Sequence, residues 1–174
     1  MIRLKVTNLS QFDTEVRAWK ARVEAATAQV AKGVAMFTLK AILKTSPQYS
    51  GDFVANWNVS IGSPDYTFNP LPVGEFSRYT EDFSYLSKEG DQRAINVALS
   101  KVSIGAYKLG QTIWLTNAAH HDDNYAVLIE ENRIKFRPEN PSGGRVVARA
   151  IQATQSSFSR INKEAALRLA AMGV

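Results

Sequence analysis

The fold of this chain is decided between residues 45 and 64, where the sequence reads TSPQYSGDFVANWNVSIGSP. A long helical pattern precedes this stretch, and Pro47 cannot continue it, because proline lacks the backbone N–H and clashes with the preceding turn. Ser50 or Asp52 can cap a short new helix, and Gly51 gives the backbone freedom at the turn. The sequence therefore predicts a helix that stops near residue 45 and a separate turn of helix after it.

The second half of the stretch predicts a strand. Phe53 and Trp57 are four residues apart and so share one face of the short helix. The residues that follow, 58–61, alternate polar and apolar side chains, which is typical of a half-buried strand. Gly62 and the residues after it end that strand. The predicted order is long helix, proline stop, one aromatic turn and strand.

A long helix is predicted upstream, from about Thr14 to Lys44. Its apolar residues recur at steps of three, four and seven, which indicates one helical stripe: Val16, Trp19, Val23, Val30, Val34 and Phe37. The large side chains Trp19 and Phe37 are expected to pack in the core. Residues 1–12 are expected to form an extended arm, because apolar and basic residues alternate at their start.

Downstream of the first strand, residues 63–90 form an aromatic-rich insertion. Its prolines break regular structure, and its Tyr and Phe content argues for order rather than disorder. The insertion either covers the sheet of its own chain or docks on another chain, since interface cores are rich in such residues. The residues alone leave both alternatives open.

The remaining elements complete an α+β fold. A helix is expected from Asp91 to about Gly105 or Gly110, and a strand at 112–117 should pair with the first strand in an antiparallel sheet. Residues 133–137 are a candidate edge strand, and a last helix is expected from Gly144. We expect one domain, 1–174, with a long N-terminal helix and a C-terminal helix packed on a small antiparallel sheet of three to five strands.

Composition limits the class of protein. The chain has 174 residues, an excess of five positive charges and no cysteine, so disulfides, thiolate metal ligands and cysteine nucleophiles are excluded. It contains no apolar run long enough for a membrane span and no signal-peptide core at its start, so we expect a protein made in a reducing cytoplasm. Residues 1–44 and 124–174 are basic, whereas 45–90 are acidic. Either these are solvated faces, or they are complementary surfaces of neighbouring copies.

The strongest candidate for catalytic chemistry is His120-His121-Asp122-Asp123. Adjacent residues in an extended loop point in opposite directions, so at most half of these side chains can face one metal ion. The chain has no other histidine to complete a metal site. A Ser/His/Asp triad is not excluded by residue counts, but no nucleophile elbow and no phosphate-binding glycine loop is present. We expect a polar loop here, no cofactor and no enzyme.

Nucleic-acid binding is the main alternative on composition. The pI of about 9.5 and two basic regions meet the first requirement for it. The basic residues are spread along the helices, and no helix-turn-helix, zinc finger or RNA-binding sheet motif is recognisable. Nonspecific contact with phosphates is the only form of binding that this pattern favours.

Three segments resemble the tail-completion or neck proteins of long-tailed phages. The first is the opening stretch, whose pattern Thr-x-Pro-x-x-(Ser/Thr)-Gly-x-(Phe/Leu)-x-x-Asn-Trp-x-Val is matched by Thr45, Pro47, Ser50, Gly51, Phe53, Asn56, Trp57 and Val59. The second runs from Asn124 through Tyr125 to Glu130, similar to the family's Tyr-Ala-x-x-(Ile/Leu)-Glu. The third, 141–150, contains Arg145 and Arg149 and is similar to the family's Pro-x-Gly-Met-Val-Arg. The match departs at Asn132, where the family has glycine.

The resemblance spans roughly residues 14–62 and 112–172 and implies a structural virion protein. Such a protein joins the head-closure ring to the tail and works by binding, without turnover. The resemblance implies a sixfold or twelvefold ring of copies around the DNA channel, with a head-closure or connector protein and a tail terminator or tail-tube protein as partners. Nonspecific contact with DNA in the channel is a further expectation. The expected interface residues are Phe53, Trp57, Tyr125, Glu130, Arg145 and Arg149, of which Phe53 and Trp57 are expected chiefly to hold the fold.

Overall fold

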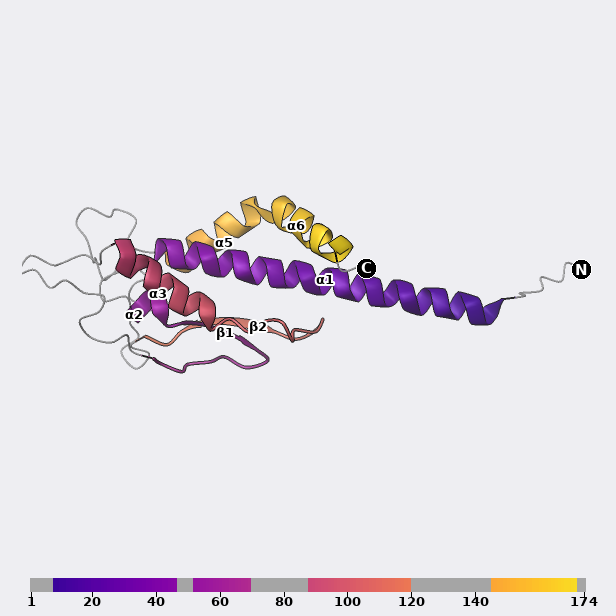
Figure 1. The fold of residues 1–174 in the computed structure, drawn as a ribbon, viewed down its shortest axis with the longest axis horizontal. Helices are drawn as coiled ribbons and strands as arrows, with labels where there is room; N and C mark the ends of the chain where they lie inside the picture. The colour runs from indigo at the N-terminus through magenta and orange to yellow at the C-terminus, as the bar shows by residue number, and fades with distance from the viewer. Residues whose placement is uncertain (1–7, 47–51, 70–87, 120–144, 172–174) are drawn as a thin grey trace, which may run out of the picture.

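A computed structural model of the chain describes residues 8–46, 52–69, 88–119 and 145–171 (Figure 1). Its main element is α1, Leu9–Thr45, a single helix of 37 residues that spans about 55 Å at 1.5 Å per residue. The C-terminal half of α1 lies in the body of the molecule, and its N-terminal half projects beyond every other described element. The long N-terminal helix predicted from the sequence is confirmed.

The start of α1 differs from the prediction. Residues 9–12 are helical rather than part of an extended arm, and the helix begins five residues before Thr14. The hydroxyl of Thr14 donates to Ser10 O at 2.8 Å, and the backbone N–H of Phe12 donates to Asn8 O at 3.0 Å. The Thr14 hydroxyl therefore bonds to a carbonyl within the helix instead of capping a helix start.

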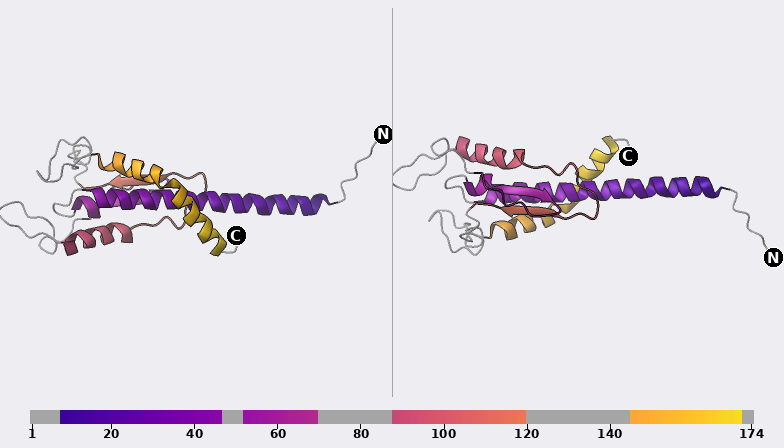
Figure 2. Two further views of the ribbon diagram at one scale, coloured as in Figure 1. Left: turned by 90° about the horizontal axis from the view of Figure 1, so that it is seen from above. Right: turned by 90° about the horizontal axis from the view of Figure 1, so that it is seen from below.

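The other elements lie around the C-terminal half of α1. The helices α5, Val146–Ser156, and α6, Phe158–Ala171, pack against it. On the opposite side lie the short helix α2, Asp52–Ala55, and the two strands, with α3, Lys88–Ser100, beside them (Figure 2). This arrangement is the predicted α+β fold.

The sheet consists of β1, Trp57–Ile61, and β2, Ile113–Asn117. The strands are antiparallel, with Trp57 opposite Asn117 and Ile61 opposite Ile113, so the predicted pairing is confirmed. Among the described residues the sheet has two strands, fewer than the three to five expected. The candidate strand at 133–137 lies outside the described residues.

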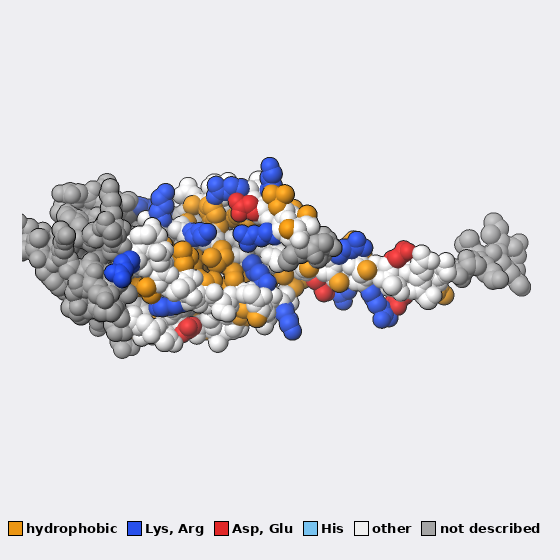
Figure 3. All heavy atoms as spheres, in the orientation of Figure 1, with side chains coloured by type: hydrophobic (Ala, Val, Ile, Leu, Met, Phe, Trp, Pro, Cys, Tyr) orange, Lys and Arg blue, Asp and Glu red, His pale blue; other side chains and the backbone are white. Residues whose placement is uncertain are grey.

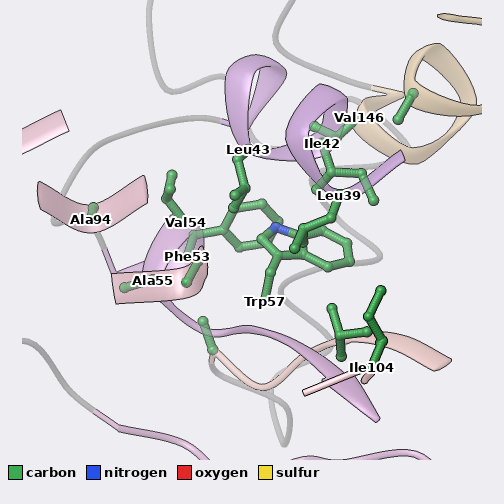
Figure 4. Close-up of a cluster of buried hydrophobic side chains, with 14 residues drawn as sticks. Leu39, Ile42, Leu43, Phe53, Val54, Ala55, Trp57, Ala94, Ile104 and Val146 are labelled. Atoms are coloured by element: carbon green, nitrogen blue, oxygen red, sulfur yellow. The ribbon is translucent and has the colours of Figure 1, made fainter. Parts of the chain in front are cut away.

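One apolar cluster joins these layers (Figure 4). It comprises fourteen buried side chains from the helices, β1 and the segments that flank β2: Leu39, Ile42, Leu43, Phe53, Val54, Ala55, Trp57, Val59, Ala94, Ala98, Ile104, Ala119, Val146 and Ala150. Small residues one helical turn apart, such as Ala94 and Ala98, let α3 approach the cluster closely. The core therefore lies where the sequence changes from helix to strand.

The last helix predicted from Gly144 is two helices in the structure, separated at Ser157. The hydroxyls of Thr154 and Ser156 donate to Ala150 O and Ala153 O. These bonds compete with the helical backbone in a run of residues with low helix propensity. The break lets α6 cross α1 at an angle instead of continuing along α5.

The middle helix α3 also differs in its limits, running from Lys88 to Ser100 instead of from Asp91 to Gly105 or Gly110. The hydroxyl of Ser100 donates to Val97 O at 2.8 Å. Directly after it, the Lys101 ammonium donates to Ala55 O at 2.9 Å. The chain therefore leaves the helix at this point and is tied to the end of α2.

Candidate interaction surfaces

The predicted aromatic turn is present and buried. The rings of Phe53 and Trp57 have centroids 5.9 Å apart and meet edge to face at 84°. Both side chains are buried in the central cluster. This geometry is favourable for aromatic pairs beyond the area that they bury. The two side chains are therefore part of the core.

Hydrogen bonds connect this turn to the end of α1. The indole Nε1 of Trp57 donates to Ser46 Oγ at 3.2 Å, and that hydroxyl donates to Ile42 O at 2.8 Å. The hydroxyl of Thr45 donates to Ala41 O at 2.9 Å. Ile42 O also accepts the backbone N–H of Ser46 at 2.8 Å, so the end of α1 is joined to the indole through one residue. We call Ser46, Phe53, Asn56 and Trp57 the helix–strand junction.

Asn56 holds the segment that follows β1. Its side chain is fully buried, its Nδ2 donates to Asn69 O at 3.0 Å, and its Oδ1 accepts the backbone N–H of Asn69 at 2.8 Å. Asn58 Nδ2 donates in the same way to Asp65 O and Thr67 O. The first part of the predicted insertion, 63–69, is thus fixed beside β1. Its remainder, from residue 70, lies outside the described residues.

Asn117 was not singled out by the sequence, although it has the same role on β2. Its Nδ2 donates to Phe53 O at 2.7 Å, and its Oδ1 accepts the backbone N–H of Ala119 at 2.9 Å. The only local signal was an asparagine at the end of a β-branched and aromatic strand. Its partner lies 64 residues earlier in the chain, so sequence spacing could not reveal it.

The structure brings together only part of the predicted site. Phe53, Asn56 and Trp57 meet at the junction, and Thr45 lies beside it at the end of α1. Pro47, Ser50, Gly51, Tyr125 and Glu130 lie outside the described residues.

Arg145 and Arg149 lie at the start of α5, one helical turn apart, and the backbone N–H of Arg149 donates to Arg145 O at 2.9 Å. Arg145 is exposed and adopts a left-handed backbone, with φ of 59°.

No group of three or more potential metal ligands occurs within the described ranges. His120 and His121 lie outside them. A Thr67 side-chain hydrogen bond, together with a bond from the Thr67 backbone, lowers the pKa of Asp65. Partial burial lowers the pKa of Lys101, and Asp65 opposes that shift. The Asp65 carboxylate bonds within the 65–69 segment, and the Lys101 ammonium ties the end of α3 to α2.

The largest unpartnered apolar feature within the described ranges lies on the projecting half of α1. It comprises five exposed side chains, here called the α1 seam: Leu9, Phe12, Val16, Trp19 and Val23. Trp19 is 63% exposed, so the expectation that it packs in the core was wrong. Phe37 of the same stripe is half-buried, with the Arg160 guanidinium 5.0 Å from its ring centroid. Exposed apolar patches of this kind typically mark interaction sites, so the α1 seam is a candidate interaction surface.

In Figure 3 Lys and Arg side chains lie around the apolar patches of the body, and charges of both signs occur along the projecting half of α1. Several of them pair within their own helix: Arg17 with Asp13 at 2.7 Å, Lys20 with Glu24 at 3.8 Å and Arg160 with Glu164 at 3.9 Å. These exposed pairs contribute little to stability. Within the described ranges, no helix combines the length and the apolar character that crossing a membrane requires.

Comparisons with protein families, with curated proteins and with solved structures found no match to this chain.

Proposed function

We propose that this protein is a structural component of the neck of a long-tailed phage, a tail-completion protein that joins the head-closure ring to the tail. It would act by binding alone. Copies would form a ring around the DNA channel, in contact with a head-closure or connector protein on one side and a tail terminator or tail-tube protein on the other. The mature protein would reside in the virion after synthesis in the host cytoplasm.

The main support for this proposal is the structure of the helix–strand junction. The residues that resemble the family's first motif and that the structure describes fall at one buried point, where Asn56 and Trp57 tie the end of α1 to β1 and to residue 69. A motif with this role specifies a rigid subunit. The exposed α1 seam adds support, because it offers protein partners an apolar surface outside the core.

Deletion of the gene from the phage or prophage genome that carries it is the direct test. The expected result is full heads and separate tails in electron micrographs, with joined particles restored when the gene is supplied in trans. Particles that join normally without the protein would exclude the neck function. Portal, capsid and tail-tube genes beside this one would add support.

Two variants separate the neck function from catalysis. Replacing both His120 and His121 by alanine should leave particle joining intact if the protein only binds, whereas a metal-dependent hydrolase would lose its activity. The change Arg145→Ala should reduce joining if the start of α5 faces a partner. Circular dichroism provides the control that each variant retains its helices.

Nonspecific nucleic-acid binding is the alternative, and the basic residues exposed around the body favour it (Figure 3). The affinity of such a protein for duplex DNA falls with salt by a slope of roughly 0.9 per phosphate contacted. A monomer that binds duplex DNA steeply in this way and forms no ring by native mass spectrometry would favour the alternative. A ring that binds tail or connector proteins, with weak DNA affinity, would favour the neck function.

A further inference from the structure

We propose that the α1 seam binds the α1 seam of a second copy of this chain, as an antiparallel pair of helices. The observation behind the proposal is the spacing of the seam. From Leu9 to Val23 the apolar residues recur at alternate steps of three and four, which is the a and d pattern of a two-stranded coiled coil. The proposal does not rest on the neck function.

The seam lies in line with the contact that α1 makes with α6 inside the same molecule. The next positions of the same repeat are Ala26, Val30, Gly33 and Phe37. At Gly33 an added Cβ would lie 2.9 Å from Ile161 Cγ2, and Arg160 covers the ring of Phe37. The face of α1 that packs against α6 is therefore the same face that is exposed on the projecting half of α1. In Figure 2 α6 crosses α1 at an angle, and no other described element covers the projecting half.

An antiparallel pair fits the apolar residues of this seam to each other. With Val16 of one helix opposite Trp19 of the other, Phe12 lies opposite Val23, and each layer combines a large with a small side chain. Leu9 then lies opposite Ala26, where α1 becomes partly buried. The overlap thus uses the free length of both helices and ends at the body of each molecule.

The charges beside the seam favour the same alignment. Asp13 and Glu15 flank the first half of the seam, and Lys20 and Arg22 flank the second half. In the antiparallel pair Asp13 faces Lys20 of the second copy, and Glu15 faces Arg22, so each flanking charge meets an opposite one. A parallel pair retains only the contact between Glu15 and Lys20. Such charges set orientation in coiled coils.

An antiparallel pair has a two-fold axis, so both copies use the same surface and no third copy can join through it. It leaves the surfaces of both bodies free for other contacts. A ring, which needs head-to-tail contacts, must therefore use those bodies or form after the pair separates. If no ring forms, the proposed pair still stands. If no pair forms, a ring can still assemble through the surfaces of the bodies.

The first experiment is sedimentation equilibrium of the full chain, from low to high micromolar concentration. We expect a reversible monomer–dimer equilibrium. Trp19→Ala should weaken it at least tenfold, because a large aromatic side chain at the centre of the contact is lost twice in each pair. The control is Leu167→Ala on α6, which removes a side chain of nearly the same exposure, 62% against 63%, and should change nothing.

A charge exchange tests the alignment. Glu15→Arg and Arg22→Glu should each weaken the pair, and the double variant should restore it, because the two residues face each other. In a parallel pair Arg22→Glu alone would have little effect and the double variant would not recover. Ala21→Arg also adds a charge, but on the exposed outer face of α1 away from the seam, and should leave the equilibrium unchanged.

Cysteine crosslinking gives a second readout, and the chain contains no cysteine to interfere. An oxidised mixture of Leu9→Cys and Ala26→Cys variants should give a disulfide-linked dimer, whereas Leu9→Cys alone should not. Crosslinking of Leu9→Cys alone would indicate a parallel pair and overturn the proposal. A chain that stays monomeric at high micromolar concentration, with or without residues 1–7, would overturn it as well, as would a dimer insensitive to Trp19→Ala.

Discussion

The helix–strand junction predicts a specific coupling between Ser46 and Trp57. Ser46→Ala removes the oxygen that accepts the indole N–H at 3.2 Å. The indole is buried, so its N–H is left without that partner. Trp57→Phe removes the same hydrogen bond from the other side and leaves no donor behind. The two single changes and the double change form a thermodynamic cycle.

The magnitudes follow from what each change leaves unpaired. A buried donor without a partner costs about 1–3 kcal/mol, whereas an ordinary hydrogen bond contributes only about 0.5–1.5 kcal/mol. Ser46→Ala should therefore cost about 1.5–3 kcal/mol when Trp57 is present. In the Trp57→Phe background the same change should cost about 0.5–1 kcal/mol, since only the hydroxyl contact with Ile42 O is lost. We expect a coupling of about 1 kcal/mol or more, a measurable share of a total stability of about 5–15 kcal/mol.

Urea unfolding followed by circular dichroism measures the four free energies without relying on tryptophan fluorescence. The slope against urea should be the same for all four proteins, since none of the changes alters the area exposed on unfolding by much. Independent sites add to within about 0.3–0.5 kcal/mol. If the double variant loses the sum of the single losses within that margin, the indole bond does not hold the junction, and the reasoning is refuted.

Three further predictions concern the contacts around the junction and α6. Gly33→Ala should destabilise the protein by up to about 2 kcal/mol, because crowding against Ile161 at 2.9 Å outweighs the gain in helix propensity; in an Ile161→Ala background the same change should stabilise it, as urea unfolding will show. Asn56→Ala should cost about 1–3 kcal/mol through the loss of both bonds to the residue 69 backbone, and amide exchange in 65–69 should become faster; unchanged exchange there would contradict this role. Thr67→Val should raise the pKa of Asp65, measured by NMR titration, because the hydroxyl is the main cause of its lowering. The carboxylate stabilises the fold above its unfolded pKa and loses this contribution as pH falls through the folded pKa, so the variant should lose less stability in acid than the original.

The part of the fold that the sequence predicted is the part governed by local signals. Pro47, the spacing of Phe53 and Trp57, and the alternation at 58–61 act within a few residues, and the helix, the turn and the strand occur where these signals lie. The pairing with residues 113–117 also followed, because two strands with one apolar face need each other.

The parts that were missed depend on partners far away in the chain. Asn117 bonds to Phe53 O across 64 residues, and no spacing marks that pair. The break at Ser157 depends on the hydroxyls of Thr154 and Ser156, which donate to nearby carbonyls. Such hydroxyls occur inside regular helices as well as at helix breaks, so the sequence does not tell the two apart. The exposure of Trp19 could not be predicted either, since an apolar stripe has the same period whichever molecule covers it.

The helix α1 is longer than its contacts with the rest of the described chain require. Most helical stability in proteins comes from packing of an apolar face, and a helix without such packing is marginal at about fifteen residues. The C-terminal half of α1 has this support from α5, α6 and the sheet, while the projecting half has the same stripe and no cover within the described chain. A helix needed only for its own core could end where α6 crosses it. The repeat instead continues without interruption to Leu9, with opposite charges arranged along it, and its simplest physical purpose is to meet a second surface with the same period.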